Sequence, residues 1–393
     1  MRRIYLDANA TTPVMPEVLE AMQPWFAADF GNASSIHQPG QRARAAVDRA
    51  RDQVARLLNC RPAEIVFTSG GTESDNMALF GVLGPGDHLI TTAIEHHAVL
   101  HTAEALVERG VEVTFLPCTT DGVVEVAALE ASVKPNTKLV SVMLANNETG
   151  VIQPVRELAD CAHAAGALFH TDAIQAAGKL PVDVKALGCD LLSISGHKMY
   201  APQGTGALFV RRNVRLKPMF FGGLHERGRR PGTENVAGIV GLGRAAELAR
   251  EWLITNGPHE LTALRDRLES GILAAIPEAG INGAPTNGEP PPRVPNTSNL
   301  WFDDVEAEAL VIALDLKGLA ISGGSACQSG ATEPSRVLRA MGLSEPRARG
   351  SVRFSLSRMN TQDEVDAAVQ LVPDAVRRLR ELAPKKQVGA LAG

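Results

Sequence analysis

The feature that most constrains the fold of this chain is a regular alternation of short β-rich runs with helical segments, which begins near residue 63. The helical segments include residues 97–109 and 155–165, and Gly166 closes the second. Alternation of this kind produces a mostly parallel sheet with helices on both faces, so we predict an α/β fold. The runs typical of strands are residues 64–68, 88–93, 111–117, 138–144, 167–171, 190–195 and 207–211.

The pattern changes in the last third of the chain, where strands and helices become fewer and shorter. A long helical stretch at 235–276 leads to a segment at 281–296 that is rich in Pro, Gly and Asn, and we expect an irregular connector there. The segments that follow it are a strand "TSNLWF", a helix at 305–317, a short strand "LAIS", a strand at 351–357 and a closing amphipathic helix.

The length of the chain, 393 residues, exceeds what one hydrophobic core comfortably supports, so two domains are expected. We predict a large domain at 15–255. Residues 1–14 and 256–385 should form a smaller α+β domain, and residues 386–393 a disordered tail.

Composition excludes several classes of protein. The net charge is -5 and there is no dense basic cluster, which argues against a nucleic-acid surface. We find neither a signal peptide nor 18 consecutive apolar residues, so no membrane span is expected. The five cysteines are far apart and form no CxxC pair, which argues against a disulfide framework. These features predict a soluble, cytoplasmic protein with free thiols.

Polar side chains follow five of the predicted strands at the points where the strands end. Since the carboxyl ends of parallel strands meet at one edge of a sheet, ligands bind there. Glycines and hydroxyls before a helix suit a phosphate group, although the same residues can act as an ordinary helix cap. The strand ends carry residues 69–74; Glu95, His96 and His97; Asn146, Asn147 and Glu148; Asp172 and Gln175; and Ser195, His197 and Lys198.

Lys198 is the most informative of these residues. Taken alone, a lysine after a buried strand is more often a surface residue with its charged end in solvent. Beside an aspartate, a phosphate cradle and a histidine, it instead suits covalent attachment of pyridoxal 5'-phosphate. In that arrangement Asp172 binds the pyridine nitrogen, Gln175 the ring hydroxyl, and Asn147 helps to fix the ring. The phosphate contacts would come from Gly71, Thr72, Ser195 and His197.

Cys327 lies in an unusual place, in the segment "SGGSACQSGA" at 322–331. Free cysteines are usually buried as small hydrophobic residues, but this segment offers little apolar material and much backbone freedom. We therefore predict a mobile loop that exposes a reactive thiol.

Several motifs together resemble one enzyme family, the NifS/IscS-type cysteine desulfurases. The resemblance covers nearly the whole chain with the motifs in the right order, and "SGHK" together with "GSAC" is more specific than any single glycine pattern. It implies an aspartate-aminotransferase-like fold (fold type I), pyridoxal phosphate as cofactor, and a homodimer. The motifs are "YLDANATTP", "GNASSIH", "FTSGGTESDN", "EHHAVL", "NNETGVIQP", "HTDAIQAAGK", "SISGHKMYAPQGTGALFVR", "RPGTENVAG", "GSACQSGATEPSRVLRAMG" and "RFSLSRMNT".

The resemblance also implies roles for single residues at the cofactor. Lys198 is the attachment point, and His96 stacks on the ring and takes part in proton transfer. Thr72, Ser195 and His197 correspond to phosphate contacts, and Thr233 to a residue that reaches the phosphate of the other subunit.

For the substrate, the resemblance implies conversion of L-cysteine to L-alanine, with transfer of the sulfur to Cys327 as a persulfide. Arg353 matches the arginine that binds the substrate carboxylate, a task for which its bidentate geometry is suited, and Asn32 and Asn147 assist. A sulfur-acceptor protein, such as an iron–sulfur scaffold, then receives the sulfur, and Cys327 could transiently ligate an iron–sulfur cluster. Gln328 stands where serine or threonine is more usual.

Three other functions stay open from the sequence. A selenocysteine lyase or a class V aminotransferase would share the cofactor, and the aminotransferase would not need Cys327. An inactive scaffold is a more distant alternative, which Lys198, Asp172 and His96 argue against. His97 and His101 have the spacing of a metal pair, but no third ligand accompanies them and we predict no metal site.

Overall fold

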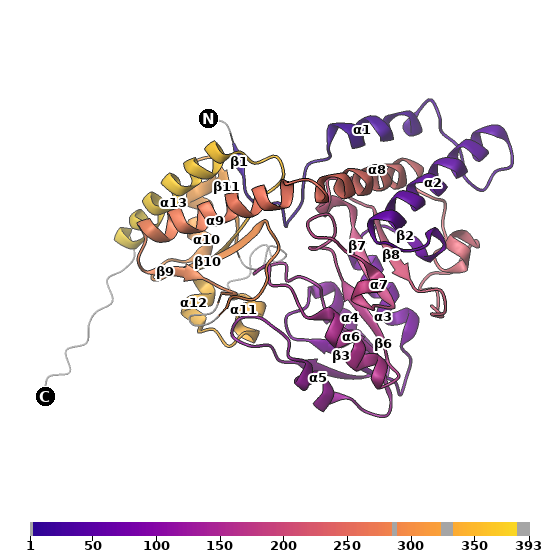
Figure 1. Ribbon diagram of the computed structural model, residues 1–393, viewed down its shortest axis with the longest axis horizontal. Coiled ribbons are helices and arrows are strands. Elements are labelled where there is room, and N and C mark those ends of the chain that lie inside the picture. Colours follow the sequence, from indigo (N-terminus) through magenta and orange to yellow (C-terminus); the bar gives the residue numbers. More distant parts are fainter. Residues whose placement is uncertain (1–2, 285–288, 324–332, 383–393) are drawn as a thin grey trace, which may run out of the picture.

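The computed structural model describes residues 3–284, 289–323 and 333–382. The chain builds a large seven-stranded sheet and two smaller sheets, of four and two strands. The larger and smaller parts lie side by side, joined near the start of the long helix α9 (Figure 1). The α/β class and the fold type I architecture are confirmed.

The large sheet contains all seven strands predicted from the sequence. Their order across the sheet is β2-β8-β7-β6-β5-β3-β4. Strand β8 runs antiparallel to both of its neighbours, and the other pairings are parallel. The strands are β2 (Ile65–Thr68), β3 (His88–Thr92), β4 (Glu112–Leu116), β5 (Thr137–Ser141), β6 (Leu168–Asp172), β7 (Leu191–Ser195) and β8 (Gly206–Val210).

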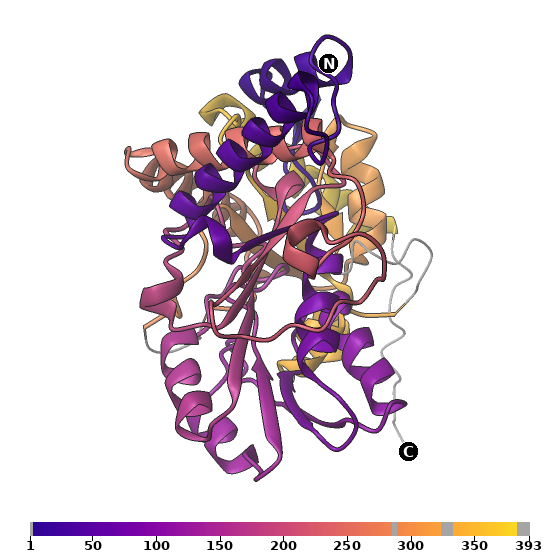
Figure 2. The same cartoon turned by 90° about the vertical axis from the view of Figure 1, so that its right-hand side faces the viewer.

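Helices cover both faces of this sheet, as predicted. Val66 packs with the apolar sides of α3 (Gly71–Val82) and α4 (His97–Val107). Its neighbour Phe67 points the other way and packs with α2 (Gln38–Leu57), α6 (Val155–Ala164) and α8 (Val236–Leu253). This division follows from strand geometry, in which successive side chains point to opposite faces. The layers on the two sides of the sheet are visible in Figure 2. Shorter elements are α1 (Pro16–Met22), α5 (Val126–Ser132), α7 (Val184–Leu187), η1 (Gln23–Phe26), η2 (Pro62–Glu64), η3 (Gly196–Lys198) and η4 (His225–Gly228).

A separate hydrophobic core lies beneath the smaller sheets. It combines Ile4 and Leu6 from the start of the chain with residues between Leu261 and Val376. The exact domain boundaries stay a prediction. The strands here are β1 (Ile4–Tyr5), β9 (Ala279–Ile281), β10 (Thr297–Phe302), β11 (Leu319–Ala320), β12 (Ser322–Gly323) and β13 (Ser351–Ser355), and the helices are α9 (Gly257–Ala275), α10 (Ala307–Asp315), α11 (Arg336–Ala340), α12 (Glu345–Arg349) and α13 (Gln362–Leu382).

The prediction of one long helical stretch at 235–276 is wrong in one respect, because two separate helices occupy this range. Helix α8 ends at Leu253 and α9 begins at Gly257, with Pro258 in its first turn. A Cβ atom on Gly257 would lie only 2.1 Å from Nε1 of Trp252, so the chain folds back on this tryptophan where only glycine fits. The predicted strand "LAIS" is likewise divided, into β11 and β12.

Candidate active site

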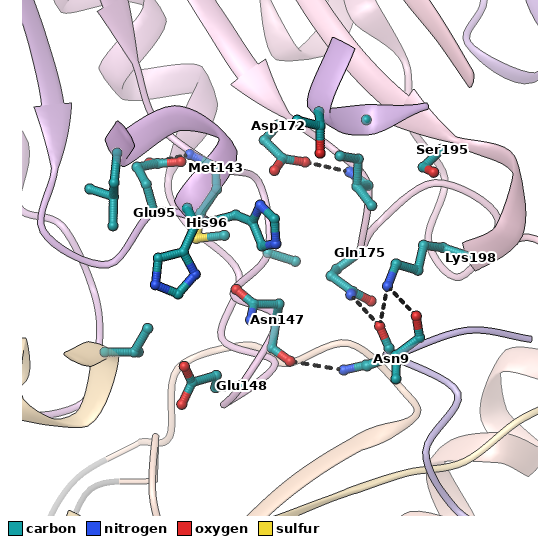
Figure 3. Close-up of a pocket in the computed structure, with 18 of the residues that line it drawn as sticks. Asn9, Glu95, His96, Met143, Asn147, Glu148, Asp172, Gln175, Ser195 and Lys198 are labelled. Carbon is teal, nitrogen blue, oxygen red and sulfur yellow. Dashed lines mark hydrogen bonds between the residues drawn. The ribbon is translucent and has the colours of Figure 1, made fainter. Parts of the chain in front are cut away.

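A cavity of about 460 Å³ lies at the carboxyl ends of the parallel strands, within the size range of small-molecule sites. Most residues predicted for the site line it together. Figure 3 shows Lys198 on the side of the cavity opposite to Glu95 and His96, with Asp172 and Gln175 between them. The predicted residues that line the cavity are Gly71, Thr72, His96, Asn147, Asp172, Gln175, Ser195, His197, Lys198 and Arg353.

One end of the cavity is formed by the first residues of α3. The N-cap residue Gly70 has φ 154° and supplies no side chain to satisfy the first N–H groups of the helix. A Cβ on Gly71 would lie 2.1 Å from Cδ1 of Ile174 and 3.6 Å from Cβ of Ser195, so this wall admits only glycine without rearrangement. The free N–H groups, the helix dipole and the Ser195 hydroxyl together suit a phosphate group.

Lys198 is placed by the short helix η3, directly after β7. Its Nζ donates hydrogen bonds to the carbonyl oxygens of Asn9 and Ala10, at 2.5 and 2.7 Å. The surface interpretation of this lysine is therefore wrong, because its amine points into the cavity.

Asp172 ends β6, and its Oδ1 accepts a hydrogen bond from the backbone N–H of Ile174 at 2.8 Å. Burial raises the pKa of this carboxyl to about 6, while the Ile174 N–H and the charge of Lys198 oppose the rise. Asp75 lies behind it, fully buried, and its pKa is raised first by burial and then by the charge of Asp172. A cationic ring nitrogen facing Asp172 would favour its ionised form.

His96 caps the start of α4. Its Nδ1 accepts a hydrogen bond from the backbone N–H of Ala98 at 3.1 Å, so the neutral ring carries its proton on Nε2. Burial, together with the charges of His97, Lys198 and His101, lowers the pKa of His96 to about 4. The imidazole is therefore neutral at pH 7 and is better suited to donate a hydrogen bond than to accept a proton.

Arg353 lies in the middle of β13 and is only 2% exposed, which excludes an ordinary surface arginine. Its guanidinium donates to Oδ1 of Asp7 and to the carbonyl oxygen of Asn147, each at 2.9 Å. The Nε atom is buried without a hydrogen-bond partner. Arg353 lines the cavity, where its guanidinium suits an anionic group.

Asn9 is a central residue of this site that the sequence analysis did not single out, although it lies within the motif "YLDANATTP". Its carbonyl accepts from Lys198 and from Nε2 of Gln175, the latter at 3.1 Å. Its Nδ2 donates to the Asn147 carbonyl at 3.2 Å and to Oγ1 of Thr297 at 2.9 Å. Asn9 thus links the cavity walls contributed by distant parts of the chain (Figure 3).

The comparisons with known proteins agree with this geometry. The family model "Aminotransferase class-V" matches residues 4–368. The chain belongs to the class V aminotransferase family. A family member named cysteine desulfurase IscS, from an Anaeromyxobacter species, is 52% identical over 388 residues, which cover 97% of this chain and 94% of that relative.

Solved structures give the same assignment. A "NifS-like protein" superposes with a TM-score of 0.88 at 37% identity, covering 96% of this chain and all of that one. The structure "SspA in complex with cysteine" has a TM-score of 0.79 at 35% identity and covers 91% of this chain and 100% of that chain. Within the class V family, these resemblances place the chain with the NifS/IscS-type cysteine desulfurases.

Two of the predicted residues, Asn32 and Thr233, are not among the described residues that line the cavity of this class V enzyme. Asn32 is exposed, and its Oδ1 accepts from the backbone N–H of Ser34. Thr233 is also exposed, in the segment before α8. The roles predicted for both stay predictions. Cys327 and Gln328 lie outside the described residues, as do the tail at 386–393 and most of the 322–331 loop.

The described residues contain no group of three or more His, Cys, Asp or Glu side chains arranged to hold a metal ion. The rings of His97 and His101 lie 5.0 Å apart and line the cavity without a third ligand among those residues. The four cysteines that the structure describes, Cys60, Cys118, Cys161 and Cys189, are free thiols. No helix in the described part is long and apolar enough to cross a membrane.

Two buried glutamates of the cavity wall were noted at strand ends but given no role. Glu148 is fully buried, its Oε2 accepts from the Ser335 hydroxyl at 2.5 Å, and burial raises its pKa to about 7. Glu95 accepts from the Thr92 hydroxyl and from the Met143 N–H through Oε1, while Oε2 is buried without a partner. Burial raises the pKa of Glu95 to about 8.

Replacing Glu95 by glutamine should change how the stability of the cofactor-free protein depends on pH. The pKa of Glu95 is higher in the folded chain, at about 8, than its ordinary value of 4.5, so its contribution is complete below pH 4.5 and is lost as pH rises toward 8. Between these values the free energy of unfolding of the wild type should fall relative to Glu95→Gln, by at most about 1.4 kcal/mol per pH unit. Urea unfolding at pH 5.5 and 7.5 measures this difference. The exposed Glu108→Gln variant serves as control, and a Glu95→Gln curve parallel to wild type would contradict the expectation.

Proposed function

We propose that this protein is a cysteine desulfurase that converts L-cysteine to L-alanine and leaves the sulfur as a persulfide on Cys327. The observation that carries the proposal is that Lys198, Asp172 and Arg353 line one cavity. An amine, a carboxylate for a ring nitrogen and an arginine for a carboxylate are the groups that a pyridoxal-phosphate enzyme acting on an amino acid requires.

The residues present fit pyridoxal 5'-phosphate. The cavity is large enough, the N-terminus of α3 supplies unsatisfied N–H groups, and Oδ1 of Asn147 is buried without a hydrogen-bond partner. Lys198 would hold the cofactor covalently, Asp172 its ring nitrogen, and Gln175 its ring hydroxyl. Thr72, Ser195 and His197 would hold its phosphate. When bound, the cofactor accepts the electrons that remain when the substrate Cα loses its proton.

The protein's own side chains then divide the remaining work. Arg353 binds the substrate carboxylate, because its guanidinium lines the cavity and is held in place by Asp7 and the Asn147 carbonyl. Lys198 takes the Cα proton and carries it within the cavity. Its charge must be lost first, since a lysine with its ordinary pKa of about 10.4 is a poor base at neutral pH. His96 donates a hydrogen bond from Nε2 rather than removing a proton.

Sulfur transfer requires the Cys327 thiolate. The thiolate attacks the substrate sulfur, the bond between that sulfur and Cβ breaks, and Cβ gains a proton to give alanine. The sum is L-cysteine plus thiol giving L-alanine plus persulfide, with no external oxidant or reductant. The described residues on either side of the segment that contains Cys327 support its role in sulfur transfer. Ser322 pairs with Arg353 in the sheet, and Glu333 and Pro334 line the cavity.

The active assembly in this proposal is a homodimer that passes its sulfur to an acceptor protein in the cytoplasm, where reducing conditions preserve the thiol. Exposed apolar side chains support the dimer, since large apolar groups in solvent mark protein interfaces. In the dimer Thr233 would contact the cofactor phosphate of the partner subunit. The exposed residues that we assign to the interface are Phe26, Phe30, Ile36, Phe220, Phe221 and Leu224.

The test of this function is incubation of the protein, loaded with pyridoxal phosphate, with L-cysteine and a thiol reductant. Alanine and sulfide should form in equal amounts, because the reductant releases each persulfide sulfur. Formation of a keto acid in place of alanine would show an aminotransferase and contradict the proposal. The protein without cofactor is the control, and L-selenocysteine as a second substrate separates a desulfurase from a selenocysteine lyase.

A further inference from the structure

Lys179 is a buried amine next to the cavity that the mechanism above does not use. It is 7% exposed, and its Nζ donates to Oε1 of Gln175 at 2.6 Å and to Oδ1 of Asn9 at 3.0 Å. Burial lowers the pKa of Lys179 well below its ordinary value, and the charges of Lys198, Arg353 and Arg358 lower it further. Since an apolar residue would fill such a position at lower cost, the amine requires an explanation.

The two hydrogen bonds of Lys179 determine how two amide groups are oriented. Both ends of an amide have similar shapes, so only the hydrogen-bond partners decide which end faces which way. Because Lys179 donates to Oε1 of Gln175, the oxygen is held away and Nε2 is left to donate. One N–H of Nε2 bonds the Asn9 carbonyl at 3.1 Å, and the second stays available to the cavity that Gln175 lines.

Asn9 is oriented in the same way. Its Oδ1 accepts from Lys179 and also from Nδ2 of Asn296 at 3.1 Å, so its own Nδ2 must face the Asn147 carbonyl. The Asn9 backbone carbonyl accepts from Lys198. Lys179 therefore orients Gln175 and Asn9, which both line the cavity, although Lys179 itself is not part of the lining.

We propose that Lys179 is a positioning residue that fixes the Gln175 amide so that its N–H, and not its oxygen, faces the ring hydroxyl of the cofactor. This inference rests on the proposed function, since it assumes that pyridoxal phosphate occupies the cavity. A donor directed at this oxygen stabilises its more negative form, and an amide turned the other way would place two oxygens against each other.

The test compares the pH dependence of the visible absorption band of the holoenzyme in the wild type and in Lys179→Met, which removes the donors and keeps the side-chain length. Loss of the oriented donor should move the midpoint of this pH titration to higher pH by about one unit. A shift of that size corresponds to the net free energy of about one hydrogen bond. Lys179→Gln keeps an N–H donor, so its midpoint should return at least part of the way to the wild-type value. Gln175→Leu should reproduce the shift, and the double variant Gln175→Leu/Lys179→Met should shift no further than either single variant.

The other outcomes overturn the inference. A normal midpoint in Lys179→Met with a lowered melting temperature would show a structural role only, as would failure of both Lys179 variants to fold. Additive shifts in the double variant would show that Lys179 acts without Gln175. The exposed Lys185→Met variant is the matched control. A wild type that binds pyridoxal phosphate without a visible band would instead contradict the proposed function, so the two failures are distinguishable.

Discussion

Replacing Lys198 by arginine is expected to reduce alanine formation from L-cysteine by at least about 10³-fold, within the range by which a positioned acid–base group accelerates reactions. The guanidinium keeps a positive charge that can still bond the Asn9 and Ala10 carbonyls, so the fold should survive. It cannot attach the cofactor covalently, and it cannot lose its charge to take a proton from Cα. Alanine formation is measured by amino-acid analysis under saturating cofactor.

Two further measurements make this expectation specific to Lys198. Borohydride reduction should fix the cofactor to the wild-type chain but not to the variant, and peptide mapping should find it on the segment that contains Lys198. The matched change at an exposed lysine, Lys185→Arg, should leave both activity and labelling unchanged. Substantial activity in Lys198→Arg, or labelling of another lysine, would contradict the assigned role.

The strands and most of the cavity could be predicted because they follow from short-range patterns and one rule of topology. Runs such as 64–68 and 190–195 show their β character locally. The strands β2, β6 and β7 run in the same direction, which brings Thr72, Asp172 and Lys198 to one edge of the sheet. Strand β8 is the exception, since it runs antiparallel and its carboxyl end faces away from that edge.

Asn9 and Lys179 could not be found in this way, because their roles depend on contacts between distant parts of the chain. Asn9 contacts Thr297, which is 288 positions away in the sequence, and Lys179, which is 170 positions away. No local sequence pattern predicts either contact. The raised pKa of Glu95 has the same origin, since it depends on complete burial rather than on neighbours in sequence. The break between α8 and α9 did have a local signal, Gly257 followed by Pro258, which the continuous helical pattern outweighed.

Replacing Cys327 by serine should remove desulfuration while the cofactor site stays intact. A hydroxyl is far less acidic than a thiol and cannot take sulfur from the substrate, so alanine formation should fall by about three orders of magnitude or more, as for removal of other nucleophiles. The visible band of the bound cofactor should be unchanged, because the described residues that line the cavity are all retained. Mass spectrometry after a single exposure to L-cysteine should show the gain of one sulfur atom on the wild type and none on Cys327→Ser.

The same variant separates the desulfurase from its nearest alternatives. An aminotransferase needs no thiol, so full turnover of Cys327→Ser with L-cysteine would overturn the assignment. Selenium leaves Cβ more readily than sulfur, so L-selenocysteine should retain more activity than L-cysteine in the variant. Serine replacement of Cys118, a half-buried cysteine whose pKa burial raises to about 11, is the matched control and should leave sulfur loading unchanged. The two thiols of one chain should therefore differ, because only Cys327 should carry sulfur.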